Sequence, residues 1–240
     1  NGDLVRVKTK SRREVTTTLT HSHLTRTKEG KIVPKIAKDL KKGDFIPVNK
    51  QMNSKVLYKK TVIKGNKGIK DVFNFDFENG WIIGAFLAEG SINGETTLCI
   101  TNISIHFEKR VKQFAARYGG KYKSRDKKGK ILPDYPEYDG KDHYVTYIPH
   151  IVRFILKHCK TGSSNKQVPG FAYFAPLEFV SGLLRGYFDG DGNVNAERQM
   201  IRVHSISQNL LEQISLLLSR FGIFGTFGVE KKDRKNQLYN

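Results

Sequence analysis

The sequence predicts an α+β protein in which one unit of helix, strands and helix occurs twice, preceded by an all-β segment. Three observations support this prediction. Two apolar segments, 79–88 and 183–190, are each closed by an acidic residue and a glycine. Each is followed by a strand pattern and then by an amphipathic helix pattern. Residues 1–50 instead carry alternating and β-branched stretches, at 4–10 and 14–20, that are typical of short strands.

The chain is strongly basic. It has 240 residues, with 42 Lys and Arg against 23 Asp and Glu, and a formal net charge of +19. Nucleic acid is the leading partner class, because Lys and Arg neutralise phosphates and release counterions. An anionic membrane surface and a merely soluble basic surface remain open alternatives. Charge of this kind indicates a partner and not a reaction.

Several classes of protein are excluded or disfavoured. No stretch approaches the ~20 continuous apolar residues of a membrane helix, so we expect no membrane span. The N-terminus is polar, and we expect no signal peptide. The two cysteines, Cys99 and Cys159, are too few for a disulfide framework or a four-cysteine zinc site. They suit a reducing compartment, so an intracellular, cytoplasmic location is expected.

Composition and pattern divide the chain into four parts. Residues 1–50 form the β segment, and residues 51–72, which are basic and contain Gly65 and Gly68, are expected to form a linker. The first repeat is predicted over 73–182 and the second over 183–240, which would stop short of a final helix.

The duplication extends beyond the apolar segments. With one residue inserted, five positions coincide: Asn93/Asn195, Glu95/Glu197, Ser104/Ser207, Arg117/Arg220 and Gly119/Gly222. Two similar units in one chain indicate a pseudo-two-fold axis, as in a dimer fused into a monomer. Two amphipathic helices could match by chance, but shared glycine and polar positions are harder to obtain in that way.

Small residues give each apolar helix a stripe on one face. Gly84 and Ala88 on the first helix, and Gly186 and Gly190 on the second, are four residues apart and therefore share a face. Such stripes let two helix backbones approach closely. The glycines that end the two segments, Gly90 and Gly192, are expected to be left-handed caps.

Packed along these stripes, the helices would bring Glu89 and Asp191 to the same end of the seam. A carboxylate in the last helical turn opposes the helix dipole at a cost of about 0.3–1 kcal/mol, and a second carboxylate adds repulsion. A bound cation would reverse both effects, and Mg²⁺ is held by one or two carboxylates together with substrate phosphates. Two unrelated helix ends with solvated acids are the alternative.

The segments 82–90 (IIGAFLAEG) and 184–192 (LRGYFDGDG) resemble the two signature motifs of LAGLIDADG homing endonucleases. The resemblance implies a duplicated αββαββα fold, sheets that bind the DNA major groove, and metal ligands at the last acid of each motif. Glu89 and Asp191 would then be catalytic and would bind Mg²⁺. The first motif departs from the common form, with Leu87 at an acidic position and Glu in place of Asp. Asp189 is expected to be structural.

A second element supports the resemblance. Lys166-Gln167-Val168-Pro169 is similar to the Lys-x-x-Pro element of intein-borne members. By this resemblance Lys166 is a third catalytic candidate, because a lysine near the scissile phosphate could polarise water or offset developing charge. A phosphate-positioning or solvated lysine is the alternative.

DNA contacts are expected from strands in both repeats. Arg and Gln are suited to base edges and Lys to phosphates, whereas many residues of a lysine run are simply solvated. The candidates are Lys121, Lys123, Arg125 and Lys127 in the first repeat, and Arg198, Gln199 and Arg202 in the second.

The N-terminal segment resembles part of an intein splicing (Hint) domain. Thr18 and His21 form a Thr-x-x-His block, followed by Ala37, Leu40 and Gly43-Asp44. The resemblance implies that Thr18 and His21 polarise the scissile peptide bond at the junction with a host-protein extein. A surface histidine on a strand is the alternative. Because the sequence begins with Asn1 and lacks a terminal His-Asn pair, we expect an internal piece of an intein that does not splice by itself.

The sequence therefore predicts a monomeric, intein-borne endonuclease that cleaves double-stranded DNA with Mg²⁺. Two alternatives remain open. One is a cleavage-inactive, maturase-like protein that binds DNA or RNA, and the other is a purely autoprocessing intein fragment.

Overall fold

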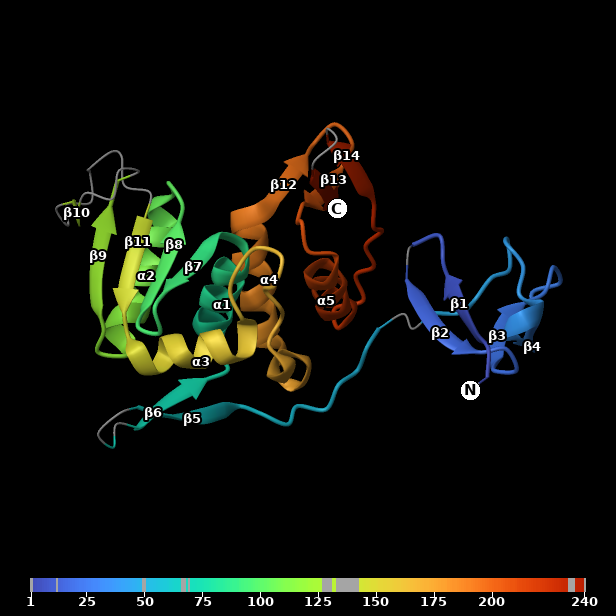
Figure 1. Ribbon diagram of the computed structural model, residues 1–240, viewed down its shortest axis with the longest axis horizontal. Coiled ribbons are helices and arrows are strands. Elements are labelled where there is room, and N and C mark those ends of the chain that lie inside the picture. Colours follow the sequence, from blue (N-terminus) through green and yellow to red (C-terminus); the bar gives the residue numbers. More distant parts are fainter. Residues whose placement is uncertain are drawn as a thin grey trace.

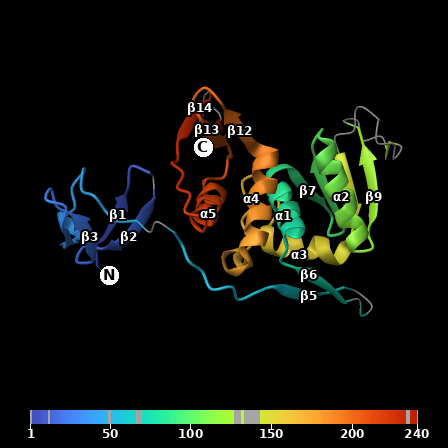
Figure 2. The same cartoon turned by 180° about the vertical axis from the view of Figure 1, so that it is seen from behind.

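The chain begins with two antiparallel hairpins. In the computed structural model, which describes residues 2–11, 13–48, 51–65, 68, 70–126, 131–132, 143–232 and 236–239, β1 (Leu4–Lys8) pairs with β2 (Glu14–Thr18). Next, β3 (Ser22–Arg26) pairs with β4 (Ile32–Ile36), and the 3₁₀ turn η1 (Ala37–Asp39) follows. These hairpins lie apart from the helices in both views (Figures 1 and 2). Ala37 is the only buried hydrophobic residue of the described part of this segment.

A third hairpin lies within the range expected to be a linker. β5 (Lys60–Lys64) pairs with β6 (Lys70–Asn74), and Ile63 and Phe73 on its inner face are buried in the main core. The basic linker predicted over 51–72 therefore contains paired strands, and the boundary at residue 73 falls inside β6. The sequence did not indicate this hairpin because lysines occupy much of its outer face. The apolar residues of its inner face are therefore surrounded by charged residues in the sequence and give no clear strand pattern.

The rest of the chain contains the same order of elements twice, which gives a mixed α/β fold (Figure 1). Each unit has a helix, two strands, a second helix and further strands. The first unit comprises α1 (Phe77–Glu89), β7 (Gly90–Asn93), β8 (Thr97–Thr101), α2 (Ile105–Arg117), β9 (Lys121–Arg125), β10 (Ile131–Leu132), β11 (His143–Tyr147) and α3 (Pro149–Cys159). After the 3₁₀ segment η3 (Gly170–Phe174), the second comprises α4 (Leu177–Asp191), β12 (Gly192–Asn195), β13 (Met200–Val203), α5 (Gln208–Ser219), β14 (Val229–Lys232) and β15 (Asn236–Tyr239).

The coinciding polar positions mark equivalent helix ends. Ser104 caps α2 by accepting a hydrogen bond from the amide of His106, and Ser207 caps α5 by accepting one from the amide of Leu210. Gly119 and Gly222, just after these helices, have positive φ values of 62° and 71°. A side chain rarely adopts this conformation, so glycine recurs at both positions.

The first unit contains a five-stranded antiparallel sheet in the order β10-β9-β11-β8-β7. Leu98, Ile100 and Tyr144 on one face are buried in the core, while alternate residues face away from it. The second unit is less covered. Val194 and Ile201, paired between β12 and β13, are 73% and 67% exposed.

The helices α1 and α4 form the centre of the molecule. A methyl group added at Gly84 would overlap the carbonyl oxygen of Leu183, and one at Gly186 would overlap that of Trp81. Gly80 and Gly182 make equally close approaches one turn earlier. The predicted close seam is therefore present, and it is one turn longer than the sequence indicated.

Asp189 joins the two helices by a hydrogen bond. Its Oδ2 accepts from Nε1 of Trp81 at 2.9 Å across the seam, and its Oδ1 accepts from Nε of Arg185 at 2.7 Å. This contact agrees with the structural role expected for Asp189.

The prediction of left-handed caps at the motif glycines is wrong. Gly90 has φ −86° and ψ 152°, and Gly192 has φ −77° and ψ 144°, so both are extended and lead directly into strands. Glycine is needed there for close approach: a Cβ at Gly90 would lie 2.6 Å from the carbonyl oxygen of Phe86, and one at Gly192 would overlap that of Phe188. Among the described helices, none combines the length and apolar character of a membrane span.

Replacing Gly186 with Ala should lower the free energy of unfolding by about 1–3 kcal/mol, because overpacking forces backbone shifts. The measurement is urea denaturation. Gly170→Ala is the matched control, because a Cβ there meets nothing within 4 Å. Equal stability of the two variants would contradict a seam that depends on backbone contact.

Candidate functional site

The helix seam brings Glu89 and Asp191 together. They are the last residues of α1 and α4, and a Cβ at Gly190 would lie 3.0 Å from Cγ of Glu89. Burial raises the pKa of the Asp191 carboxyl to about 6, and the negative charge of Glu89 adds to this effect. Burial also raises the pKa of Glu89. Two desolvated carboxylates thus meet at one end of the seam.

Lys166 occupies the same end of the seam. Its side chain reaches back from the segment after α3 and is only 5% exposed. The Nζ atom donates to the carbonyl oxygens of Leu87 at 3.2 Å and Ala88 at 3.4 Å, which belong to the last turn of α1. A cation at this position satisfies terminal carbonyl groups and complements the helix dipole.

The charge state of Lys166 depends on the two acids. Burial lowers the pKa of the ammonium to about 8, while the negative charges of Asp191 and Glu89 oppose this shift. The three predicted catalytic residues therefore lie within one electrostatic cluster. In this cluster one ammonium group faces two carboxyl groups, and the pKa of each carboxyl group is above its ordinary value.

This donor set suits a hard divalent cation. Two carboxylates that repel each other are stabilised by a positive ion, and Mg²⁺ completes its shell with water and substrate phosphate. In the described ranges, no three or more His, Cys, Asp or Glu side chains are grouped so that they could hold a metal ion by themselves. Two carboxylates are sufficient for an ion that shares its ligands with a phosphate.

The sequence did not indicate Tyr187, which lies one helical turn before Asp191. Its side chain is fully buried, and burial together with the charge of Asp191 raises the pKa of its hydroxyl. An aromatic residue four positions before an acid was the only available signal. It could not be distinguished from apolar residues that simply pack in the seam.

The first sheet presents a cationic face. Lys121, Lys123 and Arg125 alternate with Tyr122 and Ser124 along β9, so the three cations share the face that points away from the core. In the register of the sheet they lie opposite Tyr147, Val145 and His143 of β11. Lys127, the fourth candidate of this repeat, lies outside the described residues.

The second repeat places its candidates around one hairpin. Arg202 is on β13 opposite Asn193, while Arg198 and Gln199 lie in the turn between β12 and β13. The amide of Arg198 donates to Oδ1 of Asn195 at 2.8 Å, and Gln199 has a positive φ of 47°. This hairpin follows directly from Asp191, so it begins at the acidic end of the seam.

Thr18 and His21 are adjacent to each other but belong to the N-terminal hairpins. Thr18 ends β2, and the amide of His21 donates to the carbonyl oxygen of Thr18 at 3.1 Å to close a tight turn. Figure 1 shows this segment well separated from the acidic end of α1 and α4. The structure therefore contains two candidate sites rather than one.

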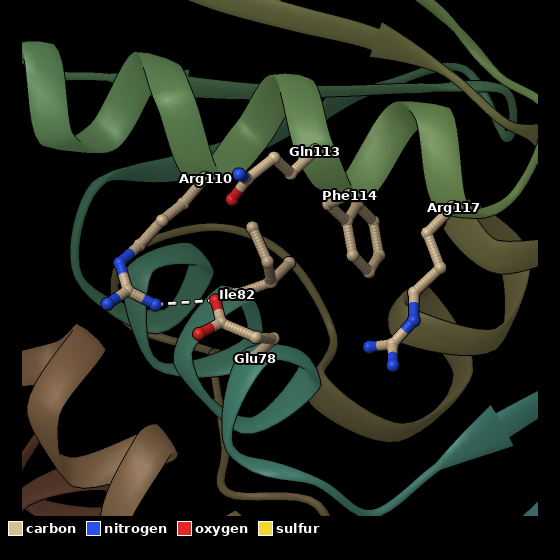
Figure 3. A pocket seen from close by; sticks show the side chains of 6 residues that line it. All are labelled: Glu78, Ile82, Arg110, Gln113, Phe114 and Arg117. Atoms are coloured by element: carbon tan, nitrogen blue, oxygen red, sulfur yellow. Dashed lines mark hydrogen bonds and ion pairs between the residues drawn. The ribbon is translucent and has the colours of Figure 1, made fainter.

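A small cavity of about 160 Å³ lies elsewhere, between α1 and α2 (Figure 3). Its two arginines are held by carboxylates: Arg110 pairs with Glu78 at 2.5 Å, and Arg117 pairs with Asp76 at 2.7 Å. These ion pairs fasten α2 to the start of α1. None of the predicted site residues lines this cavity.

The C-terminal part of the chain matches a known family. Residues 178–240 match the model described as a LAGLIDADG-like domain. This range begins at the second residue of α4 and contains Asp191, the following hairpin and α5. The match to this family model is therefore confined to the second unit.

Curated relatives match almost the whole chain. The chain is 34% identical over 257 residues to the DNA-directed RNA polymerase subunit Rpo1C of Methanocaldococcus jannaschii, a match that covers 99% of this chain and 28% of that protein. It is 27% identical over 237 residues to the ATP-dependent DNA helicase Hel308 of the same organism, covering 97% of this chain and 17% of the helicase. The chain thus spans less than a third of either relative.

Solved structures with similar folds include a variant of I-DmoI in complex with its nicked target DNA. It has a TM-score of 0.48 and 13% identity, and the match covers 70% of this chain and 89% of that one. The N-terminal LAGLIDADG domain of DUF199/WhiA has a TM-score of 0.44 and 12% identity, with coverage of 70% and 76%.

The raised pKa of Asp191 predicts a pH-dependent stability in metal-free protein. The native state binds the proton more tightly than the unfolded state, so the free energy of unfolding should fall as the pH rises from about 4 to about 6. The fall should reach at most about 3 kcal/mol and be smaller in Asp191→Asn, in which only the raised pKa of Glu89 contributes. Denaturant titrations across this range measure it.

The control is Glu197→Gln, which removes an exposed carboxylate from the nearby turn. This variant should keep the pH dependence of the wild type. A flat profile in the wild type would show that Asp191 is not desolvated.

Proposed function

We propose that this chain is an intein-borne LAGLIDADG homing endonuclease that hydrolyses both strands of a specific double-stranded DNA site. The observation that carries the proposal is the cluster at the end of the helix seam. Two acids from equivalent positions of two units meet there beside a buried lysine. A structural role alone does not account for this arrangement, since each carboxylate is desolvated and repelled by the other.

Glu89 and Asp191 would hold Mg²⁺ in this mechanism. When bound, the metal would act as a Lewis acid that stabilises the attacking and leaving oxygens of phosphodiester hydrolysis. The close approach of α1 and α4 fixes both carboxylates on helix ends, so little reorganisation is needed when the DNA arrives. The acids also exclude other anions until a cation is present.

Lys166 would supply positive charge next to the scissile phosphate. Its hydrogen bonds to the carbonyl oxygens of Leu87 and Ala88 fix the position of the ammonium. With a pKa of about 8 it is mainly protonated at neutral pH, and it can also release a proton at Nζ. This arrangement suits a group that offsets charge developing on the phosphate or orients the attacking water.

The two strand surfaces would hold the duplex on either side of the acids. Lys121, Lys123, Arg125 and Lys127 would contact one half of the site. Arg198, Gln199 and Arg202 would contact the other half. Cations on an outward sheet face favour phosphate contact, while Arg and Gln can also read base edges.

The comparisons support an inserted, mobile element. Nearly the same length of this chain matches parts of an RNA polymerase subunit and of a DNA helicase, two proteins whose names give different activities. A segment shared by two such different proteins is explained more simply as an insert present in both than as a part needed for polymerase or helicase activity. Within this proposal, residues 1–50 are the splicing segment, and Thr18 and His21 polarise the peptide bond at the extein junction.

Replacing Glu89 with Gln or Asp191 with Asn should reduce cleavage about 100-fold or more while DNA binding is retained, because each acid holds the metal. The assay incubates the chain with Mg²⁺ and a plasmid carrying the uninterrupted host-gene junction. Glu178→Gln is the matched control, because Glu178 is exposed at the opposite end of α4. Undiminished cutting by both acid variants would refute the assignment.

The same assay separates the alternative functions. Wild-type binding without a cut would indicate a cleavage-inactive, maturase-like protein. The absence of both binding and cutting would leave the autoprocessing fragment.

Lys166 should give the cleavage rate a pH dependence. If the ammonium form is required, the rate at saturating DNA should fall as the pH rises above about 8. Lys166→Arg, which stays charged at any pH used, should retain a reduced rate without this fall. Lys166→Met should lose most activity at every pH, and an unchanged rate in this variant would contradict the proposed role.

A further inference from the structure

The β5–β6 hairpin has two chemically different faces. Its inner face carries Ile63 and Phe73, which are buried. The residues of its outer face, called the lysine face below, are all exposed, and none of them is acidic. The members of this face are Lys60, Val62 and Lys64 on β5, and Lys70, Val72 and Asn74 on β6.

The hairpin is firmly anchored through its inner face. The ring of Phe73 lies 5.0 Å from that of Phe154 on α3, measured between centroids. Asp71 of β6 pairs with His150 near the start of α3 at 2.5 Å. Because these contacts hold the inner face against α3, the lysine face points away from the body of the protein. Figure 1 shows the hairpin on the outer side of α3, at the foot of α1.

The lysine face is electrostatically unfavourable in isolation. Lys64 and Lys70 lie directly opposite each other across the strands, and like charges at such positions destabilise a hairpin. No ion pair with Lys60, Lys64 or Lys70 occurs in the part of the chain that the structure describes. The β1–β2 hairpin differs, because there Lys8 lies opposite Glu14 and pairs with it.

The centre of the lysine face is uncharged. Val62 and Val72 form the cross-strand pair between the lysines, with 57% and 45% of their surfaces exposed. A polyanion can approach such a surface without displacing an acidic competitor. The charge of the face is therefore complementary to a phosphate backbone.

We propose that the lysine face binds the phosphate backbone of a second DNA segment, separate from the segment held at the acids. This inference rests on the proposed function for the identity of the partner as DNA. Glu89 lies at the far end of α1 from the hairpin, about 18 Å along the helix axis. Because the lysine face lies at the opposite end of the helix seam and points away from α3, a duplex held at the acids does not also lie along it. Phosphate contacts of this kind carry no sequence information.

A bridging experiment tests the proposal. Donor-labelled and acceptor-labelled short duplexes are mixed with the full chain at low salt, and energy transfer reports two duplexes on one protein. The wild type should bridge them. The triple variant Lys60→Ser, Lys64→Ser, Lys70→Ser should still bind and cut one duplex but bridge at least about tenfold less, because it loses three phosphate contacts.

The matched control removes the same charge elsewhere. Lys28→Ser, Lys31→Ser and Lys42→Ser change three exposed lysines of the N-terminal segment, and this variant should bridge like the wild type. A second variant, Lys64→Glu, tests whether weaker bridging results from misfolding of the hairpin, since it places a negative charge opposite Lys70. It should stabilise the hairpin and still weaken bridging.

Each outcome bears on one proposal. Equal bridging by the hairpin variant and the wild type would contradict the proposal of a second DNA-binding surface. Binding of one duplex by the wild type without bridging would contradict it as well. Both results leave the endonuclease assignment untouched, which depends on the metal-dependent cut. Bridging to duplex RNA but not to DNA would overturn DNA as the partner of the lysine face.

Discussion

The architecture depends on direct backbone contact between α1 and α4. Four glycines, Gly80, Gly84, Gly182 and Gly186, remove the side chains that would otherwise separate the helices. Ordinary side chains hold packed helices 8–10 Å apart. The closer seam is what brings the last residues of the two helices into one small volume. The hydrogen bond from Trp81 to Asp189 adds a directional contact that fixes the helices against sliding.

The close contact between α1 and α4 also has an electrostatic cost, which Lys166 offsets only in part. Helix C-termini carry partial negative charge, and the seam places Glu89 and Asp191 where two such termini meet. Lys166 offsets some of this charge, but it is itself desolvated, and its pKa falls to about 8. The cluster keeps excess negative charge in a partly buried position. A site that concentrates charge in this way is organised to receive a cation and a substrate rather than to maximise stability.

The sequence predicted those features that depend on local pattern. The repeat, the seam and the meeting of Glu89 and Asp191 follow from spacing and from short motifs, and the structure contains all three. Lys166, which was indicated only through a family resemblance, lies beside the two acids. The β5–β6 hairpin was missed because its buried residues, Ile63 and Phe73, become visible as a pattern only once the strands are paired. The caps at Gly90 and Gly192 were predicted wrongly because glycine serves both positive φ and close approach, and sequence does not distinguish the two. Tyr187 was missed because burial beside an acid is a tertiary property.

The distribution of acidic residues explains why the excess positive charge, a net +19, is concentrated on particular surfaces. Most described ion pairs fasten structural elements: Glu14 holds the first hairpin, Asp44 holds Lys35, and Glu78 and Asp76 hold α2 against α1. Acids lie at these contacts and at the seam, while the outward faces of β9 and of the β5–β6 hairpin carry lysine and arginine side chains. A solubilising surface would intersperse both signs. Segregation of this kind instead concentrates positive potential on two rigid strand surfaces, each anchored to the core by its opposite face, and surfaces of that kind attract polyanions in a fixed orientation.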